Sequence, residues 1–160
     1  MRKINLSEIP DHERKSPTGK YHARYKEISL ALGRDRDSLD LSKRHPFDLA
    51  LLSIPPGGSH CPYHAHSAQS ELYLIVSGRA HVRDQGGMTD VGPGDAFFFG
   101  PGEAHQILNP GPDNLSYYVI ADNPIGESCY YPDSKKWAVF RPPDNIIMKG
   151  SETHYFDGEE

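Results

Sequence analysis

The sequence contains only two cysteines, no apolar run long enough to span a membrane, and no excess of positive charge. Cys61 and Cys129 lie far apart and lack the paired spacing of a thiolate zinc site, so they do not make a disulfide framework. The first residues are too polar for a signal peptide. The formal net charge is −5, without a basic stripe that would predict nucleic-acid binding. We therefore expect a cytoplasmic protein without a nucleic-acid or membrane partner.

The 160 residues suit one domain with a hydrophobic core. Glycine (15) and proline (14) are frequent, and they separate short β-rich segments. These segments are 47–57, 71–78, 79–87, 94–102, 105–111 and 115–124. Helix-length periodicity is absent from this middle portion of the sequence. Short strands with regularly spaced turn signals predict an all-β fold, either an antiparallel sandwich or a barrel.

The two ends of the chain are less regular. The first twenty or so residues are polar and predict an arm, and alternation within residues 28–33 indicates a strand or a short helix. Near the C-terminus we expect one strand, around Trp137 to Phe140, within an ordered tail that wraps the body. Trp137, Phe140, Ile146 and Ile147 are candidates to anchor it. We divide the chain into an arm (1–45), a barrel (46–122) and a packed extension (123–160).

One short segment, "HAHSAQSE", suggests chemistry. His64 and His66 are two residues apart, so on an extended chain both imidazoles point to the same face. Glu71 begins the next apolar segment and can return a carboxylate to the same point. Tyr73 would share the face of Glu71. The segment therefore predicts half of a metal site.

A fourth candidate ligand, His105, follows a tight Gly-Pro-Gly turn at the start of a later segment. In an antiparallel barrel it can lie beside the strand of His64 and His66. Three imidazoles and one carboxylate suit manganese, iron, cobalt, nickel, copper or zinc. If the metal is six-coordinate, four protein ligands leave two positions for water, substrate or dioxygen, and an open position distinguishes a catalytic site from a structural one.

The spacing of these residues resembles the first motif of the cupin superfamily. That motif is a glycine, five residues, HxH, three or four residues, a glutamate, six residues and a glycine. Here Gly58, His64, His66, Glu71 and Gly78 follow the same spacing.

The second cupin motif is a glycine, five residues, Pro-x-Gly, two residues, a histidine, three residues and an asparagine. This sequence has Gly94, Gly102, His105 and Asn109 in that register. One position departs, because Gly100 stands where the family has proline, and proline follows one place later. The departure leaves His105 in register.

The resemblance covers about residues 46–122 and implies a double-stranded β-helix, or jelly-roll, barrel. It also implies that His64, His66, Glu71 and His105 are the ligands of one divalent transition metal. Many proteins of the superfamily form dimers, often by exchanging N-terminal strands. The resemblance therefore implies a homodimer, with residues 28–33 as the candidate for exchange.

Two further residues are candidate catalytic groups. Tyr73 should point inward with Glu71 and could orient a substrate through its hydroxyl, although a core tyrosine is an equal alternative. His60 precedes the ligands by four residues and is either a substrate contact or an exposed loop histidine.

The expected function is a metal-dependent enzyme acting on a small polar or carbohydrate-like molecule. Isomerisation of a sugar or sugar phosphate and a dioxygenase reaction both fit such a site. The alternative is a non-catalytic module that binds a small ligand. Resemblance in fold does not choose between these, because one scaffold supports many chemistries.

Overall fold

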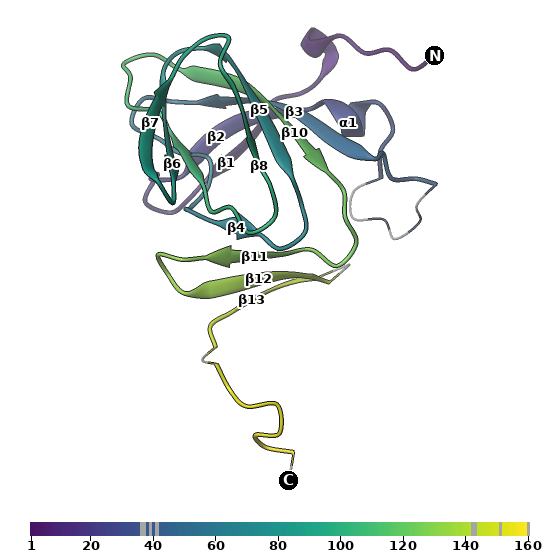
Figure 1. Ribbon diagram of the computed structural model, residues 1–160. Coiled ribbons are helices and arrows are strands. Elements are labelled where there is room, and N and C mark those ends of the chain that lie inside the picture. Colours follow the sequence, from purple (N-terminus) through teal and green to yellow (C-terminus); the bar gives the residue numbers. More distant parts are fainter. Residues whose placement is uncertain (36–37, 39, 41, 142–143, 151, 160) are drawn as a thin grey trace.

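The computed structural model describes residues 1–35, 38, 40, 42–141, 144–150 and 152–159 (Figure 1). The short helices are η1 (Leu6–Glu8) and α1 (Ile28–Ala31). The strands, in chain order, are β1 (His12–Lys15), β2 (His22–Glu27), β3 (Phe47–Ile54), β4 (Ala65–His66), β5 (Glu71–Ser77), β6 (Ala80–Asp84), β7 (Gly87–Val91), β8 (Ala96–Phe99), β9 (Gln106–Leu108), β10 (Leu115–Asp122), β11 (Ser128–Tyr131), β12 (Lys136–Arg141) and β13 (Asp144–Met148).

The strands form three sheets. One has six strands in the order β1-β2-β3-β10-β5-β8, and a second has three in the order β7-β6-β9. The third has the order β13-β12-β11-β4. All pairings between these strands are antiparallel. The predicted all-β fold is confirmed, and the first two sheets form the jelly-roll barrel.

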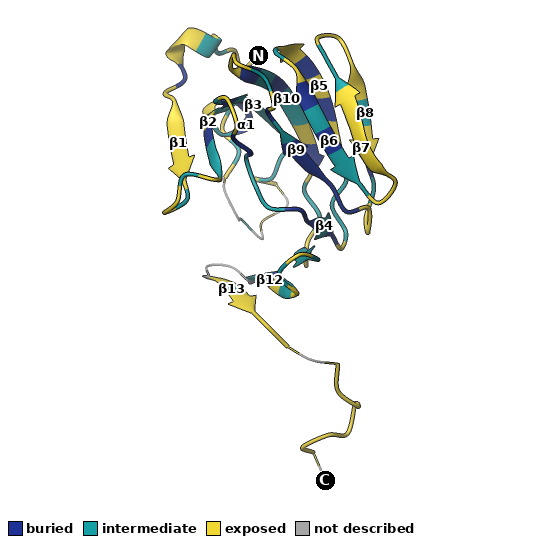
Figure 2. Ribbon diagram, turned by 90° about the vertical axis from the view of Figure 1, so that its left-hand side faces the viewer, coloured by how far each residue is buried: buried dark blue, intermediate teal, exposed yellow. Residues whose placement is uncertain are grey.

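The hydrophobic core lies between the six-stranded and three-stranded sheets (Figure 2). Leu52, Tyr73 and Tyr117 contribute from the larger sheet, and Val82 and Ile107 contribute from the smaller one. Alternation along each strand places these side chains inside and their neighbours outside. Burial of this apolar surface is the main stabilising contribution that we expect for the barrel. Within the described residues, no helix is both long enough and apolar enough to cross a membrane.

The N-terminal segment is more regular than the sequence predicts. β1 and β2 form a hairpin, and β2 pairs with β3, which adds two strands to the barrel sheet. Within residues 28–33 the structure has a helical turn, α1, and not a strand. The helix ends at Ala31, and Gly33, two residues later, has a φ of +92° and donates its N–H to the carbonyl of Leu30. A glycine in this conformation is a common helix terminator, and it explains why alternation was misleading here.

The C-terminal extension contains three strands where one was predicted. β12 covers the predicted strand, and β11 and β13 flank it in an antiparallel meander. The segment after β13 leads away from the barrel (Figure 1), whereas β11 is joined to the barrel end through its pairing with β4. Trp137 is 41% exposed and packs against Tyr130 of the same small sheet with the ring planes tilted by 36°, and Ile147 is 60% exposed. Trp137 thus packs within the small sheet.

Candidate metal centre

Four segments bring the candidate ligands together. His64 precedes β4, and its backbone pairs with that of His105 through two hydrogen bonds of 3.1 and 2.8 Å. This bridge places the two imidazole centroids 4.7 Å apart. His66 ends β4, and Glu71 begins β5 after a four-residue link. The structure therefore brings all four sequence-predicted residues to one place at one end of the barrel.

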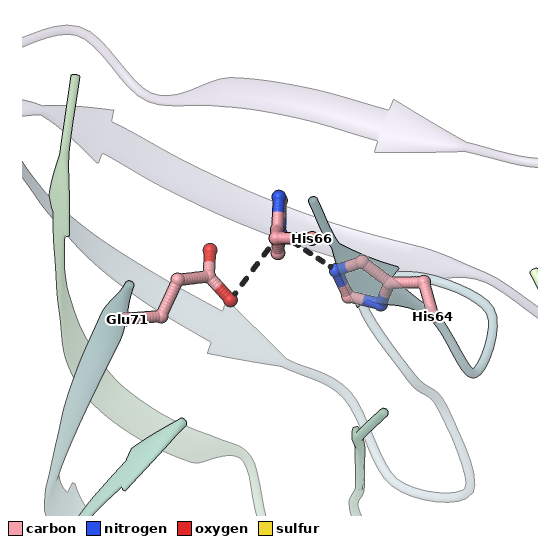
Figure 3. A group of neighbouring side chains, drawn as sticks. All are labelled: His64, His66 and Glu71. Atoms are coloured by element: carbon pink, nitrogen blue, oxygen red, sulfur yellow. Dashed lines mark hydrogen bonds and ion pairs between the residues drawn. The ribbon is translucent and has the colours of Figure 1, made fainter. Parts of the chain in front are cut away.

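The donor atoms of these side chains lie close together, and Figure 3 shows His64, His66 and Glu71. Nε2 of His64 lies 3.2 Å from Nε2 of His66, which lies 3.5 Å from Oε2 of Glu71. The same carboxylate oxygen lies 2.8 Å from Nε2 of His105. His66 is thus between Glu71 and His64, and Glu71 connects this group to His105. All four side chains are largely buried.

The remaining ring nitrogen of each histidine faces a hydrogen-bond acceptor. Nδ1 of His64 is 2.9 Å from the carbonyl of Pro62, and Nδ1 of His105 is 3.0 Å from the carbonyl of Glu103. Nδ1 of His66 is 3.2 Å from Oε1 of Glu127. A carbonyl or carboxylate oxygen accepts only, so each Nδ1 carries a proton and donates it. Nε2 then faces the cluster, where it offers a lone pair if the ring is neutral and an N–H, as in the contact of His105 with Glu71, if the ring is protonated.

This donor set fits a divalent metal. Zinc bonds to imidazole nitrogen and to carboxylate oxygen are about 2.0–2.2 Å long, so adjacent ligand atoms lie roughly 3–3.5 Å apart. The donor atoms of His64, His66 and Glu71 all lie within 4.8 Å of one another, and their neighbouring separations of 3.2 and 3.5 Å are close to that spacing. His105 joins this group through its 2.8 Å contact with Glu71. Lone pairs facing one another at such distances require a proton or a cation between them. Three nitrogens and one oxygen suit manganese, iron, cobalt, nickel, copper or zinc.

The pKa values of the candidate ligands are shifted in different directions. Burial lowers the pKa of His64 to about 4, so its imidazole is neutral at pH 7. Burial alone would raise the pKa of Glu71, but the hydrogen bond with His105 and the charge of His66 outweigh it and lower the pKa to about 2. Burial likewise opposes protonation of His66, but contacts with Cys129, Glu127 and Glu71 outweigh it and raise its pKa to about 10. A cation bound here would displace the second proton of His66.

Aromatic side chains hold the cluster from the barrel side. The Tyr73 hydroxyl donates to Oε2 of Glu71 at 2.6 Å and lies 3.2 Å from Nε2 of His105. Burial, with the charge of Glu71, raises the pKa of Tyr73 well above its usual value, so the hydroxyl keeps its proton. Phe99 stacks on the His105 ring with 4.1 Å between centroids. Tyr73 is thus both a core residue and a neighbour of the candidate ligands.

His60 is placed differently. It is half-buried in the loop before β4, and in the described part of the chain no hydrogen bond joins it to the four candidate ligands. Burial, and then the charge of Arg14, lower its pKa to about 4. Its imidazole is therefore neutral at pH 7. Cys61, next in the chain, has its sulfur 3.7 Å from Nδ1 of His64, behind the ring and away from the converging Nε2 atoms.

Sequence reasoning missed two residues beside His66. Glu127 and Cys129 come from the C-terminal extension and reach Nδ1 of His66 at 3.2 and 3.3 Å. The pairing of β11 with β4 brings them there, with Cys129 opposite His66. Both residues lie outside the two sequence motifs. A pairing with a two-residue strand has no signal in the sequence, so nothing marked them.

The arrangement of the barrel agrees with a comparison to known families. The family model for the cupin domain matches residues 50–121, which run from within β3 through most of β10 and include all four candidate ligands. Residues 50–121 are a cupin domain.

A curated relative of this cupin is an oxalate-binding protein from Thermotoga maritima, 32% identical over 71 residues. The match covers 44% of this chain and 58% of that protein, so the chain spans little more than half the length of the curated relative.

Two solved structures also resemble this cupin. One is described as a sugar phosphate isomerase from Silicibacter pomeroyi; it has a TM-score of 0.77 at 19% identity and covers 96% of this chain and 97% of its own. The other is a predicted oxalate decarboxylase from Thermotoga maritima, with a TM-score of 0.59 at 23% identity, covering 75% of this chain and 97% of its own. At these identities the likeness shows the fold.

Proposed function

We propose that this cupin binds one divalent transition metal through His64, His66, Glu71 and His105. The observation that carries the proposal is the convergence of Nε2 and Oε2 atoms at 2.8–3.5 Å, with each Nδ1 turned outward to an acceptor. Preorganised imidazoles with their tautomers fixed by outer hydrogen bonds are typical of metal sites. A hydrogen-bonded polar cluster alone would not need all three rings to present the same nitrogen.

We further propose that the site serves an enzyme acting on a small polar or carbohydrate-like molecule. A bound divalent metal supplies Lewis-acid polarisation of a substrate oxygen, and a redox-active metal would also support a dioxygenase reaction. An isomerase-like reaction is favoured by the likeness to the Silicibacter pomeroyi protein, which extends over the C-terminal sheet as well as the barrel. Sugar phosphates and oxalate both present adjacent oxygen atoms to a Lewis acid.

Two side chains have proposed roles in proton handling. Tyr73 keeps its proton and donates a hydrogen bond at the edge of the cluster, which suits it to orient a substrate oxygen. His60 is the second candidate and has a nitrogen lone pair at pH 7, but its pKa of about 4 makes it a weak proton acceptor. Neither group is a ligand in the proposed site, so each can be replaced without removing a metal bond.

The alternative function is a module that binds a small molecule without catalysis. The named activity of the Thermotoga maritima relative, oxalate binding, favours this alternative. Both functions use the same four ligands. They differ in whether a bound molecule is converted, so product formation distinguishes them.

The first experiment is elemental analysis of the purified protein without added metal, beside the double variant His64→Ala/His66→Ala. We expect near-stoichiometric metal in the parent and very little in the variant, and His105→Ala should also retain much less. Equal metal content in the parent and in His105→Ala would contradict the site.

The identity of the metal then directs the search for activity. Iron, nickel or copper would lead to dioxygen-uptake screens, and manganese or zinc to isomerase screens on hydroxy-carbonyl compounds. Binding of a small acid or sugar without turnover, with metal present, would support the binding module. Absence of any metal uptake on titration would remove the basis of both versions of the enzyme.

A further inference from the structure

The carboxylate behind His66 belongs to Glu127, in the link between β10 and β11. Glu127 is 9% exposed and lies outside residues 50–121, which the cupin family model matches. Oε1 accepts from Nδ1 of His66 at 3.2 Å and from the backbone N–H of Ser67 at 3.0 Å. Oε2 accepts from the backbone N–H groups of Ala68 and Gln69 at 3.0 and 2.8 Å. Each oxygen of this buried carboxylate thus has two donors.

The three backbone donors form the link between two candidate ligands. Residues 67–70 connect His66 at the end of β4 to Glu71 at the start of β5. Successive N–H groups that converge on one anion form a nest, which favours negative charge at its centre. Glu127 therefore contacts both the ring of His66 and the chain that sets the position of Glu71 relative to it.

The C-terminal sheet holds Glu127 in place. Ser67 donates its backbone N–H to the carbonyl of Ser128 at 2.8 Å, and Ser128 donates its own to Oγ of Ser67 at 2.9 Å. Glu127 also accepts, through its carbonyl, from the backbone N–H of Phe140 in β12. The carboxylate is thus fixed by backbone contacts on both sides.

Among the three candidate histidine ligands, His66 has an unusual outer acceptor. Nδ1 of His64 and of His105 each meet a carbonyl two residues earlier in the chain, which is a neutral and local partner. Nδ1 of His66 meets a carboxylate 61 residues away. Cys129 also approaches this nitrogen, but a thiol sulfur is only a weak acceptor. A carboxylate acceptor raises the basicity of a metal-bound imidazole more than a carbonyl does.

We propose that Glu127 is the positioning residue of the metal centre. It fixes His66 with Nδ1 protonated and Nε2 directed into the site, and it fixes the link that presents Glu71. The inference rests on the proposed metal-binding function. It assigns part of the site to the C-terminal extension, which the barrel motifs do not include.

A competing reading makes Glu127 a ligand of a second cation. Nδ1 of His66, a carboxylate oxygen of Glu127 and Sγ of Cys129 lie within 4.8 Å of one another. However, both oxygens of Glu127 already accept from N–H groups, and those donors would face a cation placed there. We therefore favour one metal per chain, with Glu127 outside the ligand set.

The test compares Glu127→Gln with Asp122→Asn. Asp122 accepts from the backbone N–H of Ser70 at 2.9 Å, so it secures the same link without contacting an imidazole. Each chain is stripped with a chelator and titrated with Co²⁺ and Zn²⁺. We expect Glu127→Gln to weaken metal affinity by about 10- to 100-fold and to shift the visible Co²⁺ spectrum. Asp122→Asn should keep the spectrum of the parent.

Further measurements keep the inference separate from misfolding and from failure of the metal site. Circular dichroism establishes whether Glu127→Gln folds. If it does not fold, Glu127→Asp replaces it, because aspartate keeps the negative charge on a shorter side chain. We expect Glu127→Asp to bind metal more weakly than the parent as well. If folded Glu127→Gln binds metal as tightly as the parent while His105→Ala loses binding, the role of Glu127 is overturned and the metal site itself is not. A second equivalent of metal in the parent that disappears in Glu127→Gln would also overturn it. No metal binding by the parent would instead reject the proposed function.

Discussion

His60 lies four residues before His64, yet its surroundings are different. Burial, followed by the positive charge of Arg14, lowers its pKa from 6.5 to about 4, while the carboxylate of Glu71 acts in the opposite direction. At a pH between these two pKa values, the unfolded chain binds more protons at this position than the folded chain does. The stability that depends on neutral His60 is therefore complete above pH 6.5 and is lost as the pH falls toward 4.

This difference predicts a pH-dependent stability in the chelator-stripped protein. On lowering the pH from 7.5 to 5, His60 should contribute a loss of about 1–2 kcal/mol in the free energy of unfolding. Urea unfolding at both pH values measures the loss, and His60→Asn should show a smaller loss by that amount. The same pH dependence in the variant would contradict the burial of a neutral His60.

At the level of single residues, the sequence pointed to the four candidate ligands that the structure brings close together, but not to the residues that hold them in place. His64, His66, Glu71 and His105 could be found because the spacing of side chains along a strand is fixed by the pleat, and because two motifs resembled a known family. Tyr73 could be placed on the same face as Glu71 for the same reason. Glu127 could not be found, since its position depends on which strand β11 pairs with, and a lone acid in a turn-rich segment does not reveal that.

Among the elements, the turn at Gly78 joins β5 to β6 and has strict steric requirements. Gly78 has a φ of +83°, and a Cβ there would lie 2.8 Å from the carbonyl oxygen of Asn114 and 2.9 Å from Cα of Leu115. Both contacts are with backbone, which cannot rotate away. The final glycine of the first motif is thus required by the approach of the chain that leads into β10.

We expect Gly78→Ala to lower the free energy of unfolding by about 2–4 kcal/mol, from the left-handed conformation and the backbone overlap together. Gly92→Ala is the matched control, because a Cβ at Gly92 would meet nothing within 4 Å and its φ is not in the left-handed range. Denaturant unfolding of both variants gives the comparison. Equal stability of the two would show that the turn can relax.

The strands of the barrel were predictable because each is a short apolar segment that ends at glycine or proline. β3, β5, β6, β8, β9 and β10 all fall within the predicted segments. The errors were where tertiary pairing decides the conformation. Alternation in residues 28–33 left a strand and a short helix open, and the helix forms because β2 stops pairing with β3 after Glu27. The Ser29 hydroxyl then accepts the backbone N–H of Leu49. β11 and β13 exist because they pair with β12, which alone had a clear pattern.

For the whole molecule, the outer face of the six-stranded sheet has an apolar patch over four strands. Cross-strand register aligns its members in two rows: Leu49, Ile120, Leu72 and Phe98, and beside them Leu51, Tyr118, Leu74 and Ala96. Leu72 is 39% exposed and Phe98 is 58% exposed. On the same face of β2, Arg24 borders the patch and approaches Glu13, so this border carries both signs of charge.

The expected homodimer remains a prediction, and this patch is the surface that we expect it to bury. A two-fold axis through an uncharged patch brings no like charges together, and the border of mixed sign is complementary to itself. We expect sedimentation equilibrium to give a dimer for the parent. Phe98→Asp/Leu72→Asp should be a monomer, whereas Met88→Asp, at an exposed apolar residue of β7, should remain a dimer. A monomeric parent would contradict the prediction.

β4 is only two residues long, and it belongs to the C-terminal sheet while its neighbour His64 is paired with His105 of the barrel. Cys129 lies opposite His66 in that short pairing. Separation of β11 from β4 would therefore displace a candidate ligand and its carboxylate partner in the same movement, while the barrel core between the other two sheets stayed packed. Local opening of the small sheet is thus a low-energy route for release of a bound ion, and its frequency would limit how long the protein retains its metal.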